Sequence, residues 1–305
     1  MKISILSART GWHTDELCRA LADRGHAASV VPYQGLAARI GGGAARLSSG
    51  GDALFDADAV LARIIPDGSL EQIIYRVDAL HWIEERGVPV VNAPRAIERS
   101  VDKFYTTALL SEAGLPTPDT VVCEDAASAM AAIREFGDAV IKPIFGSMGH
   151  GCVRVTDPDV GFRIARSLEQ IRSVFYVQRM VDHGGRDIRV FVVGGRVLGA
   201  IARTAPDGEW RTNVARGGAA LPVELPAAWE QLALRAADVI GADYAGIDLL
   251  QARDGTVFVL EVNGIPGWQG LQRATGLDVA GAIVDELEEV VRRRSQRVYA
   301  VNDRT

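Results

Sequence analysis

The alternation of apolar and polar positions at the start of the chain predicts a βαβ unit. Residues 3–7 have the length and composition of a strand, residues 15–24 carry a helical apolar period, and residues 28–32 read as a second strand. Apolar runs at 58–65 and 88–94 predict further strands of the same block. We therefore expect an α/β domain of nucleotide-binding type at the N-terminus.

Two glycine-containing segments of this block bear on its function. The Gly- and Ser-rich stretch 39–52 predicts a surface loop, with a phosphate cradle as the alternative, although no lysine and no clear helix start follow it. The turn SARTGWHT after the first strand lacks the G-x-G-x-x-G spacing that brings a backbone close to a pyrophosphate. An NAD-linked oxidoreductase is therefore disfavoured.

The pattern changes near Arg99. VDKFYTTALLSEAG predicts a helix that ends at Gly114, and residues 126–136 predict another. DAVIKPIFGSMGHGCVRV then predicts two strands joined by a mobile glycine loop, which is typical of a lid. We expect a central domain here.

A third block follows, with strands at 175–181 and in DIRVFVVGGRVLGAIAR, a helix at 227–240 and a hairpin. The tail VDELEEVVRRRSQR predicts an amphipathic helix whose arginines suit its C-terminal dipole, and we interpret it as a solvated charged end. The expected fold class is α/β (α+β), with domains at 1–97, 98–176 and 177–305.

Composition narrows the function classes. The chain of 305 residues is 48% hydrophobic and has a net charge of −6, which predicts a multidomain globular protein and argues against nucleic acid as a partner. Cys18, Cys123 and Cys152 form no C-x-x-C pair, so neither a disulfide framework nor a zinc site is indicated. No 18-residue apolar stretch or export signal occurs, so we expect a cytoplasmic protein without a membrane partner. The sequence favours neither a monomer nor a homo-oligomer.

The hairpin YAGIDLLQARDGTVFVLEVNG indicates a metal site. With Asp254 and Gly255 as a two-residue turn, Asp248 faces Glu261, with β-carbons about 4.5–5.5 Å apart. Asn263 lies two residues on and points to the same face. Two carboxylates and an amide suit a hard divalent cation, Mg²⁺ or Mn²⁺, that shares phosphate oxygens. A solvated strand-end acid is the alternative, since a longer turn would shift the register.

Candidate phosphate-binding groups lie in IKPIFGSMGHG. Gly146, Gly149 and Gly151 free the backbone to turn N–H groups towards an anion, and Lys142 at a strand end can reach the same phosphates. The P-loop is excluded because Cys and Val follow the last glycine. A plain glycine hairpin is the alternative, but a lysine in an apolar strand is costly without an anionic partner.

Arginines supply further positive charge before the carboxylate hairpin. Arg189, Arg203 and Arg211 could grip carboxylates and phosphates through paired hydrogen bonds, which suits an acidic substrate that becomes phosphorylated. Ordinary surface arginines are the alternative. His150 and His183 are interpreted as loop residues.

The order of these motifs resembles the ATP-grasp superfamily, and within it the RimK-like amino-acid ligases, from about residue 58 to 290. The resemblance implies an ATP-grasp fold with an N-terminal Rossmann-like domain, a central lid and a C-terminal domain that clamp ATP. The hinge 178–181 looks like the segment whose backbone reads adenine. The residues implied to bind ATP are Lys103, Lys142, Gly146, Ser147, Gly149, Gly151, Gln178, Arg179, Met180, Val181, Asp187, Arg189, Arg211 and Asn213. Those implied to act in catalysis are Arg203 and Arg211, and the implied Mg²⁺ ligands are Asp248, Glu261 and Asn263.

The resemblance departs from many RimK-like ligases in EVNGIPGWQGLQ, where Ile265 and Trp268 resemble versions associated with coenzyme acceptors such as pterin-linked acids. Trp268 could offer the acceptor a stacking face, with core packing as the alternative. We therefore expect an ATP-dependent ligase that adds L-glutamate to a small acid through an acylphosphate. A ligase acting on a protein or peptide C-terminus and a non-catalytic nucleotide-binding module are the alternatives.

Overall fold

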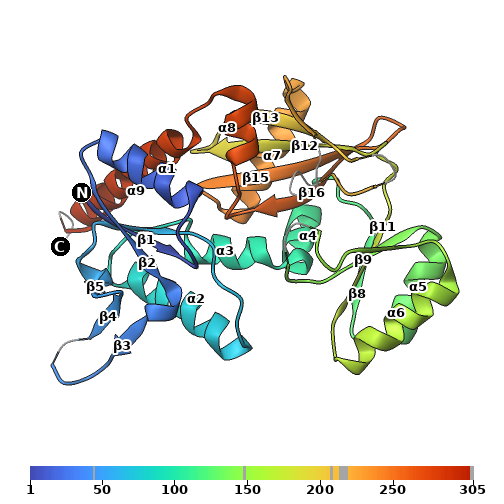
Figure 1. Ribbon diagram of the computed structural model, residues 1–305, viewed down its shortest axis with the longest axis horizontal. Helices are drawn as coiled ribbons and strands as arrows, with labels where there is room; N and C mark the ends of the chain where they lie inside the picture. The colour runs from blue at the N-terminus through green and yellow to red at the C-terminus, as the bar shows by residue number, and fades with distance from the viewer. Residues whose placement is uncertain (44, 147–148, 207–208, 213–218, 303–305) are drawn as a thin grey trace.

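The computed structural model describes the whole chain except residues 44, 147–148, 207–208, 213–218 and 303–305, and the side chains of 297–302 are also left out. Four sheets are packed with helices, which confirms the predicted mixed α/β class (Figure 1). Within the described residues, no helix combines the length and the apolar composition needed to cross a bilayer.

The N-terminal block is built on a parallel sheet with the strand order β2-β1-β6-β7. Its elements are β1 (Lys2–Ser7), α1 (Trp12–Asp23), β2 (Ala27–Pro32), β6 (Ala59–Ala62), α2 (Leu70–Glu85), β7 (Val90–Val91) and α3 (Pro94–Val101). The chain moves outward from β1 to β2 and then returns to place β6 on the other side of β1. The carboxyl ends of β1 and β6 therefore form the topological switch point of the sheet.

The predicted surface loop at 39–52 is wrong in part, because this region contributes to a small antiparallel sheet. Its strands are β3 (Ala37–Arg39), β4 (Arg46–Ser49) and β5 (Asp52–Ala53), flanked by the short helices η1 (Tyr33–Gly35) and η2 (Leu54–Asp56). Leu47 is buried with Tyr33 and Leu54, so one apolar side chain ties the glycine-rich stretch to the domain.

The central block has an antiparallel sheet with the order β10-β9-β11-β8. Its elements are α4 (Lys103–Glu112), β8 (Thr120–Cys123), α5 (Ala126–Phe136), β9 (Ala139–Lys142), β10 (Val153–Val155), α6 (Pro158–Gln170) and β11 (Phe175–Arg179). Helices α5 and α6 cover one face and bury Ile141, Phe175 and Val177 there. Since side chains alternate along a strand, Lys142, Tyr176 and Gln178 are left for the other face.

The C-terminal block holds a five-stranded antiparallel sheet with the order β14-β13-β12-β15-β16. Its elements are β12 (Arg186–Val193), β13 (Arg196–Thr204), β14 (Ala219–Pro222), α7 (Ala227–Ile240), β15 (Tyr244–Gln251), β16 (Val257–Asn263), α8 (Gln269–Thr275) and α9 (Val279–Asn302). Helix α7 packs on one face through Ala233, Ala236 and Ile240.

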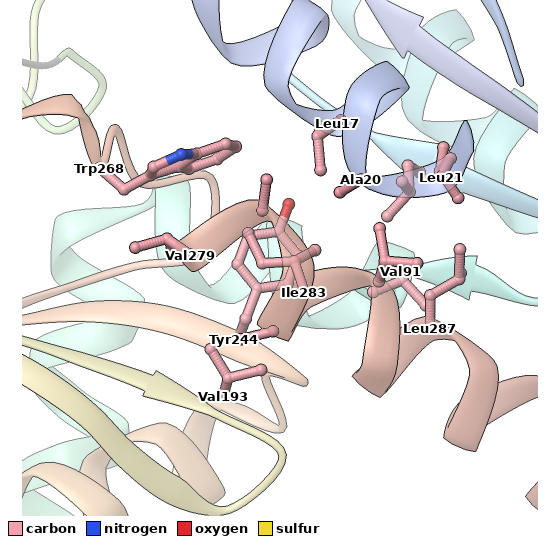
Figure 2. Close-up of a cluster of buried hydrophobic side chains, with 14 of the residues drawn as sticks. Leu17, Ala20, Leu21, Val91, Val193, Tyr244, Trp268, Val279, Ile283 and Leu287 are labelled. Atoms are coloured by element: carbon pink, nitrogen blue, oxygen red, sulfur yellow. The ribbon is translucent and has the colours of Figure 1, made fainter. Parts of the chain in front are cut away.

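One hydrophobic core joins the N-terminal and C-terminal blocks (Figure 2). Leu17 and Leu21 of α1 meet Ile283 and Leu287 of α9 in it, together with Trp268. The interpretation of the tail as a solvated end is therefore wrong, because its apolar face is buried and only its polar face is exposed. Apolar burial on this scale fixes the two blocks relative to each other.

Candidate active site

The predicted pairing of Asp248 with Glu261 is confirmed, although the turn that was expected to produce it is different. Close to the turn the pairs run one residue out of the predicted register, because the loop has three residues and Gly255 takes a left-handed φ of 90°. Leu249 opposite Val259 still follows this shifted register, and a bulge between Asp248 and Leu249 then restores the predicted one, with Asp248 opposite Glu261.

Asp248 is held by two arginines. Arg189, its cross-strand partner on β12, donates from Nε to Oδ1 (2.7 Å) and from Nη2 to Oδ2 (2.6 Å), and Arg203 Nη2 lies 2.9 Å from Oδ2. Asp248 is only 4% exposed. Burial alone would raise the pKa of this carboxyl, but the charges of Arg189 and Arg203 outweigh burial and lower the pKa to about 2. Asp248 is therefore ionised at neutral pH.

The same network extends across a third strand. Arg203 on β13 faces Asp187 on β12 and donates to it from Nε (2.7 Å) and Nη2 (2.5 Å), and the Thr212 hydroxyl donates to the same carboxylate (2.6 Å). Both Arg203 and Asp187 are buried. Two arginines and two aspartates thus form a chain whose charges balance, buried except for the half-buried Arg189, and the sequence analysis missed that the aspartates hold the arginines.

Glu261 and Asn263 contrast with Asp248. No hydrogen bond or ion pair to the half-buried Glu261 carboxylate is formed within the described part of the chain. Asn263 Oδ1 accepts one hydrogen bond, from the Ile265 backbone N–H (3.0 Å). Three of the roughly four acceptor positions of the Asp248 carboxylate are taken.

This donor set fits a hard divalent cation. Glu261 offers a complete carboxylate, Asn263 a remaining lone pair, and Asp248 one position on Oδ1. No group of three His, Cys, Asp or Glu side chains able to hold a metal occurs among the residues described. A cation here would depend on amide, phosphate and water oxygens as well, which is the usual habit of Mg²⁺.

Two lysines face this site from the central block. Lys142 Nζ donates to Gln178 Oε1 (2.7 Å), while Gln178 Nε2 donates to Thr120 Oγ1 (3.0 Å) and the Tyr176 hydroxyl (3.1 Å). Burial lowers the pKa of Lys142, and the carboxylate of Glu261 counters that effect. Lys142 therefore lies within electrostatic reach of the candidate metal ligands.

Lys103 approaches the glycine loop from α4. Its Nζ donates to the Gly146 carbonyl (2.7 Å), and its backbone N–H donates to Ile144. Gly146, Gly149 and Gly151 all have positive φ, a backbone conformation that favours glycine at these three positions. Ser147 lies outside the described residues.

The hinge is partly occupied by the protein's own backbone. The N–H groups of Arg179 and Met180 donate to the carbonyls of Asp119 (2.8 Å) and Asp138 (2.9 Å), and the Gln178 side chain points to Lys142. Val181 has no backbone partner within the described residues. It is the hinge position whose N–H and carbonyl are available to a ligand.

Arg211 stands apart from the arginine network. Its Nε and Nη2 donate to Glu209 (2.9 and 2.8 Å), which lowers the pKa of Glu209 to about 2. Asn213 lies outside the described residues. A cavity of about 260 Å³ adjoins the hinge, lined by Met180, His183 and Trp210 among others, and does not include Lys142 or the metal-ligand candidates.

Trp268 is a core residue, so the predicted stacking face for an acceptor is wrong. Its side chain is 1% exposed and its ring packs against His13, with centroids 4.6 Å apart, and against Phe191. The Arg63 guanidinium lies 4.6 Å above the ring centroid. Arg63 and Asn92 of the N-terminal block bind the loop that precedes Trp268, at Pro266 and Gly264. No short sequence pattern predicts either contact.

Two models of known protein domains together match nearly all of the chain. The profile of the RimK PreATP-grasp domain matches residues 1–97, and that of the RimK-like ATP-grasp domain matches residues 100–287. The chain is 36% identical over 265 residues to the tetrahydromethanopterin:alpha-L-glutamate ligase of Methanosarcina acetivorans, covering 78% of this chain and 82% of that one. It is 34% identical over 293 residues to a probable alpha-L-glutamate ligase of Trichodesmium erythraeum, covering 95% and 96%.

Solved structures show the same fold. The RimK domain protein ATP-grasp of Sphaerobacter thermophilus matches with a TM-score of 0.70 at 25% identity, covering 94% of this chain and 99% of that one. The ATP-grasp ligase PsnB, complexed with a minimal precursor, matches with a TM-score of 0.76 at 23% identity, covering 94% and 98%.

Proposed function

The chain belongs to the RimK-like ATP-grasp family of ATP-dependent ligases, and on that premise we propose that it joins L-glutamate to a small pterin-linked acid. The observation that carries the proposal is the carboxylate of Glu261, which has no partner within the described residues and lies beside the Arg189–Asp248–Arg203 network, within electrostatic reach of Lys142. The tetrahydromethanopterin ligases among its relatives support the acceptor class.

We assign the reaction to three regions: an N-terminal domain at 1–97, a central lid domain at 98–176 and a C-terminal domain at 177–305. Lys103, Lys142 and the glycine loop 146–151 would hold the phosphates of ATP, and the hinge 178–181 and Asp187 would contact the rest of the nucleotide. Glu261, Asn263 and Oδ1 of Asp248 would hold Mg²⁺. The bound ion would neutralise phosphate charge.

The proposed chemistry has two steps. An oxygen of the acceptor carboxylate attacks the γ-phosphorus of ATP and ADP leaves, giving an acylphosphate. The glutamate amine then attacks the acyl carbon, loses a proton and displaces phosphate, so that an amide forms. A carboxylate is a poor electrophile, and the first step supplies the leaving group that it lacks.

The arginine network suits this chemistry because its charges balance before substrate binds. Arg189 and Arg203 neutralise Asp248 and Asp187 in the free protein. A cation held at Oδ1 of Asp248 would weaken the hold of that carboxylate on Arg189, and the guanidinium group would then have donors for a phosphoryl group. Arg211, now held by Glu209, would join them by exchanging that partner.

A screen of ADP release tests the proposal. Tetrahydromethanopterin, folic acid and a peptide ending in glutamate are each paired with each amino acid, and the product mass is recorded. We expect ADP only when a pterin-linked acid and glutamate are both present, with one glutamyl residue or more added. If glutamate supports ADP release with the peptide but with neither pterin-linked acid, the protein is a peptide ligase. ADP release with another amino acid in place of glutamate would overturn the glutamate assignment.

A cytoplasmic location belongs to the same proposal. ATP is supplied there, and the thiols of Cys18, Cys123 and Cys152, which are free in the structure, stay reduced.

A further inference from the structure

Three arginines gather around the switch point of the N-terminal sheet. Arg9 follows the carboxyl end of β1, Arg63 follows the carboxyl end of β6, and Arg76 lies on the helix after it. Ligands of open α/β sheets bind in the crevice outside such strand ends. None of these arginines forms an ion pair with a carboxylate in the described part of the chain.

Two of these cations are buried, and the groups to which they donate within the described residues are neutral hydroxyl and carbonyl oxygens. Arg63 is 2% exposed and donates to the Tyr244 hydroxyl (3.1 Å) and the Pro266 carbonyl (3.2 Å). Arg76 is 6% exposed and donates to the Pro66 carbonyl (2.7 Å). Burying a cation without a counter-ion is costly, and the equally buried Arg203 has two carboxylates instead. Within the described residues, the N-terminal cluster therefore has no ion-paired carboxylate.

Two titratable groups that face the cluster, His13 and Tyr33, add no negative charge. His13 faces Arg63 and Arg9, and burial together with these two cations lowers the pKa of its imidazole to about 4. The Tyr33 hydroxyl donates to the Arg63 carbonyl (3.4 Å), and burial raises the pKa of that phenol well above its usual range. Both groups are neutral at pH 7, so the charge of the cluster is positive.

The cluster adjoins the turn that carries the metal-ligand candidates. Arg63 binds Pro266, three residues beyond Asn263. Asn92 on the same domain donates through Nδ2 to the carbonyls of Gly264 (2.5 Å) and Tyr244 (2.8 Å). The N-terminal block thus holds the loop that follows the ligands, and an anion at the arginines would lie beside the proposed phosphoryl-transfer centre.

An apolar surface borders the same arginines. Ile64 directly follows Arg63, and Leu70, Ile73 and Ile74 on the first turns of α2 precede Arg76. All four are exposed, Leu70 by 75%. Exposed apolar side chains gathered in one short segment of the chain are typical of a ligand or partner surface.

We propose that Arg9, Arg63 and Arg76 form a subsite for a carboxylate of the acceptor acid, whose apolar body lies on the exposed side chains of residues 64–74. The subsite rests on the proposed function, because it assigns this carboxylate to the acceptor and not to glutamate or ATP. It also gives the N-terminal domain a direct part in substrate recognition.

Kinetics of three variants test the assignment. Arg9→Ala removes an exposed arginine whose side chain makes no hydrogen bond within the described residues, so the fold should persist. Arg76→Lys keeps a buried charge but loses the planar donors. Arg46→Ala, on the separate sheet strand β4, removes one positive charge elsewhere in the same domain and serves as the matched control.

We expect Arg9→Ala to raise the KM for the acceptor about tenfold or more, as the loss of a charge-assisted hydrogen bond predicts, with the KM values for ATP and glutamate within about twofold. Arg76→Lys should act in the same direction and Arg46→Ala should change nothing. An unchanged acceptor KM in Arg9→Ala, or a rise confined to glutamate, overturns the subsite.

A binding measurement separates this inference from the proposed function. Calorimetry with p-aminobenzoyl-L-glutamate, a flat aromatic dicarboxylate, is carried out with saturating ADP and Mg²⁺ and needs no turnover. If the probe binds the unmodified protein and loses affinity about tenfold in Arg9→Ala, the subsite stands even when no acid supports ADP release. If ADP is released as proposed but the probe binds both proteins equally, the function stands and the subsite is wrong.

Discussion

Arg189 grips Asp248 through two parallel hydrogen bonds, 2.7 Å from Nε to Oδ1 and 2.6 Å from Nη2 to Oδ2. The cross-strand partner of Asp248, Glu261, has no such contact within the described residues. Two carboxylates that look equivalent as metal ligands therefore differ in their contacts within the folded protein. Asp248 balances buried arginines, whereas Glu261 is left for a ligand.

Substitution of the two carboxylates should separate these roles. Glu261→Gln should lower turnover by about 10 to 100-fold or more with little change in stability, because it removes only a ligand charge. Asp248→Asn should lose turnover and also about 3 kcal/mol of unfolding free energy, because Arg189 and Arg203 are left with an uncompensated charge. Turnover at limiting Mg²⁺ and urea unfolding measure the two effects. Near-normal turnover in both variants would remove the metal assignment.

Replacement of Lys142 should lower the affinity for ATP without lowering the stability of the fold. Its half-buried side chain forms no ion pair within the described residues, although Glu261 and Asp248 act on it electrostatically, and burial lowers its pKa. Lys142→Met should therefore weaken ATP binding about tenfold or more while leaving the melting temperature unchanged or higher. Calorimetric titration with an ATP analogue and a thermal scan test this. Unchanged nucleotide affinity would exclude Lys142 from phosphate binding.

His13 should make stability depend on pH. Its pKa lies near 4 in the folded protein, below the ordinary 6.5, because of burial and then the charges of Arg63 and Arg9. The unfolded chain therefore binds the proton first, so stability is full above pH 6.5 and falls as the pH drops towards 4. Because the ring is only half-buried, the unfolding free energy should fall by about 1–3 kcal/mol over this pH range.

The measurement compares urea unfolding at pH 7 and pH 4.5 in the unmodified protein and in His13→Asn, which cannot take up the proton. The Trp268 backbone N–H donates to His13 Nε2 (3.2 Å), so protonation at Nε2 also removes an acceptor. An identical pH dependence in the two proteins would show that His13 is not the group responsible.

Trp268→Ala should behave as a core substitution. The ring is enclosed by His13, Phe191 and Arg63, so we expect a loss of about 3–5 kcal/mol in unfolding free energy. The KM values for acceptor and ATP should not diverge from each other. A selective rise in the acceptor KM with normal stability would restore the stacking role that the sequence suggested.

The sequence predicted the opposed carboxylates from the alternation of side chains along a hairpin, and Lys142 from its place at the end of a strand, whereas Lys103 at the start of α4 was implied only by the family resemblance. The Asp248–Glu261 pairing survived an error in the turn because the longer loop and the bulge cancel. The composition of a hairpin reveals neither the third loop residue nor the bulge. The predicted pairing was therefore correct because these two unpredicted features shift the register in opposite directions.

The sequence could not distinguish a buried Trp268 from a ligand-facing one, since both surroundings favour an aromatic ring. It also left helix α2 unassigned, although Ser69 and Gln72 form the reciprocal capping box that marks its start. The contacts of Arg63 with Tyr244 and of Asn92 with Gly264 join residues more than 150 positions apart. Only the packing of the two blocks brings such partners together.

The account as a whole is tested most directly by ADP release from the purified chain with ATP, Mg²⁺, a pterin-linked acid and L-glutamate. We predict that ADP appears only when acid and glutamate are present together, and that the product is heavier than the acid by one or more glutamyl residues, each of them glutamate less one water. ADP release that does not depend on the acid or on the amine, or binding of ATP without any amide product across the screen, would contradict the proposed ligase reaction.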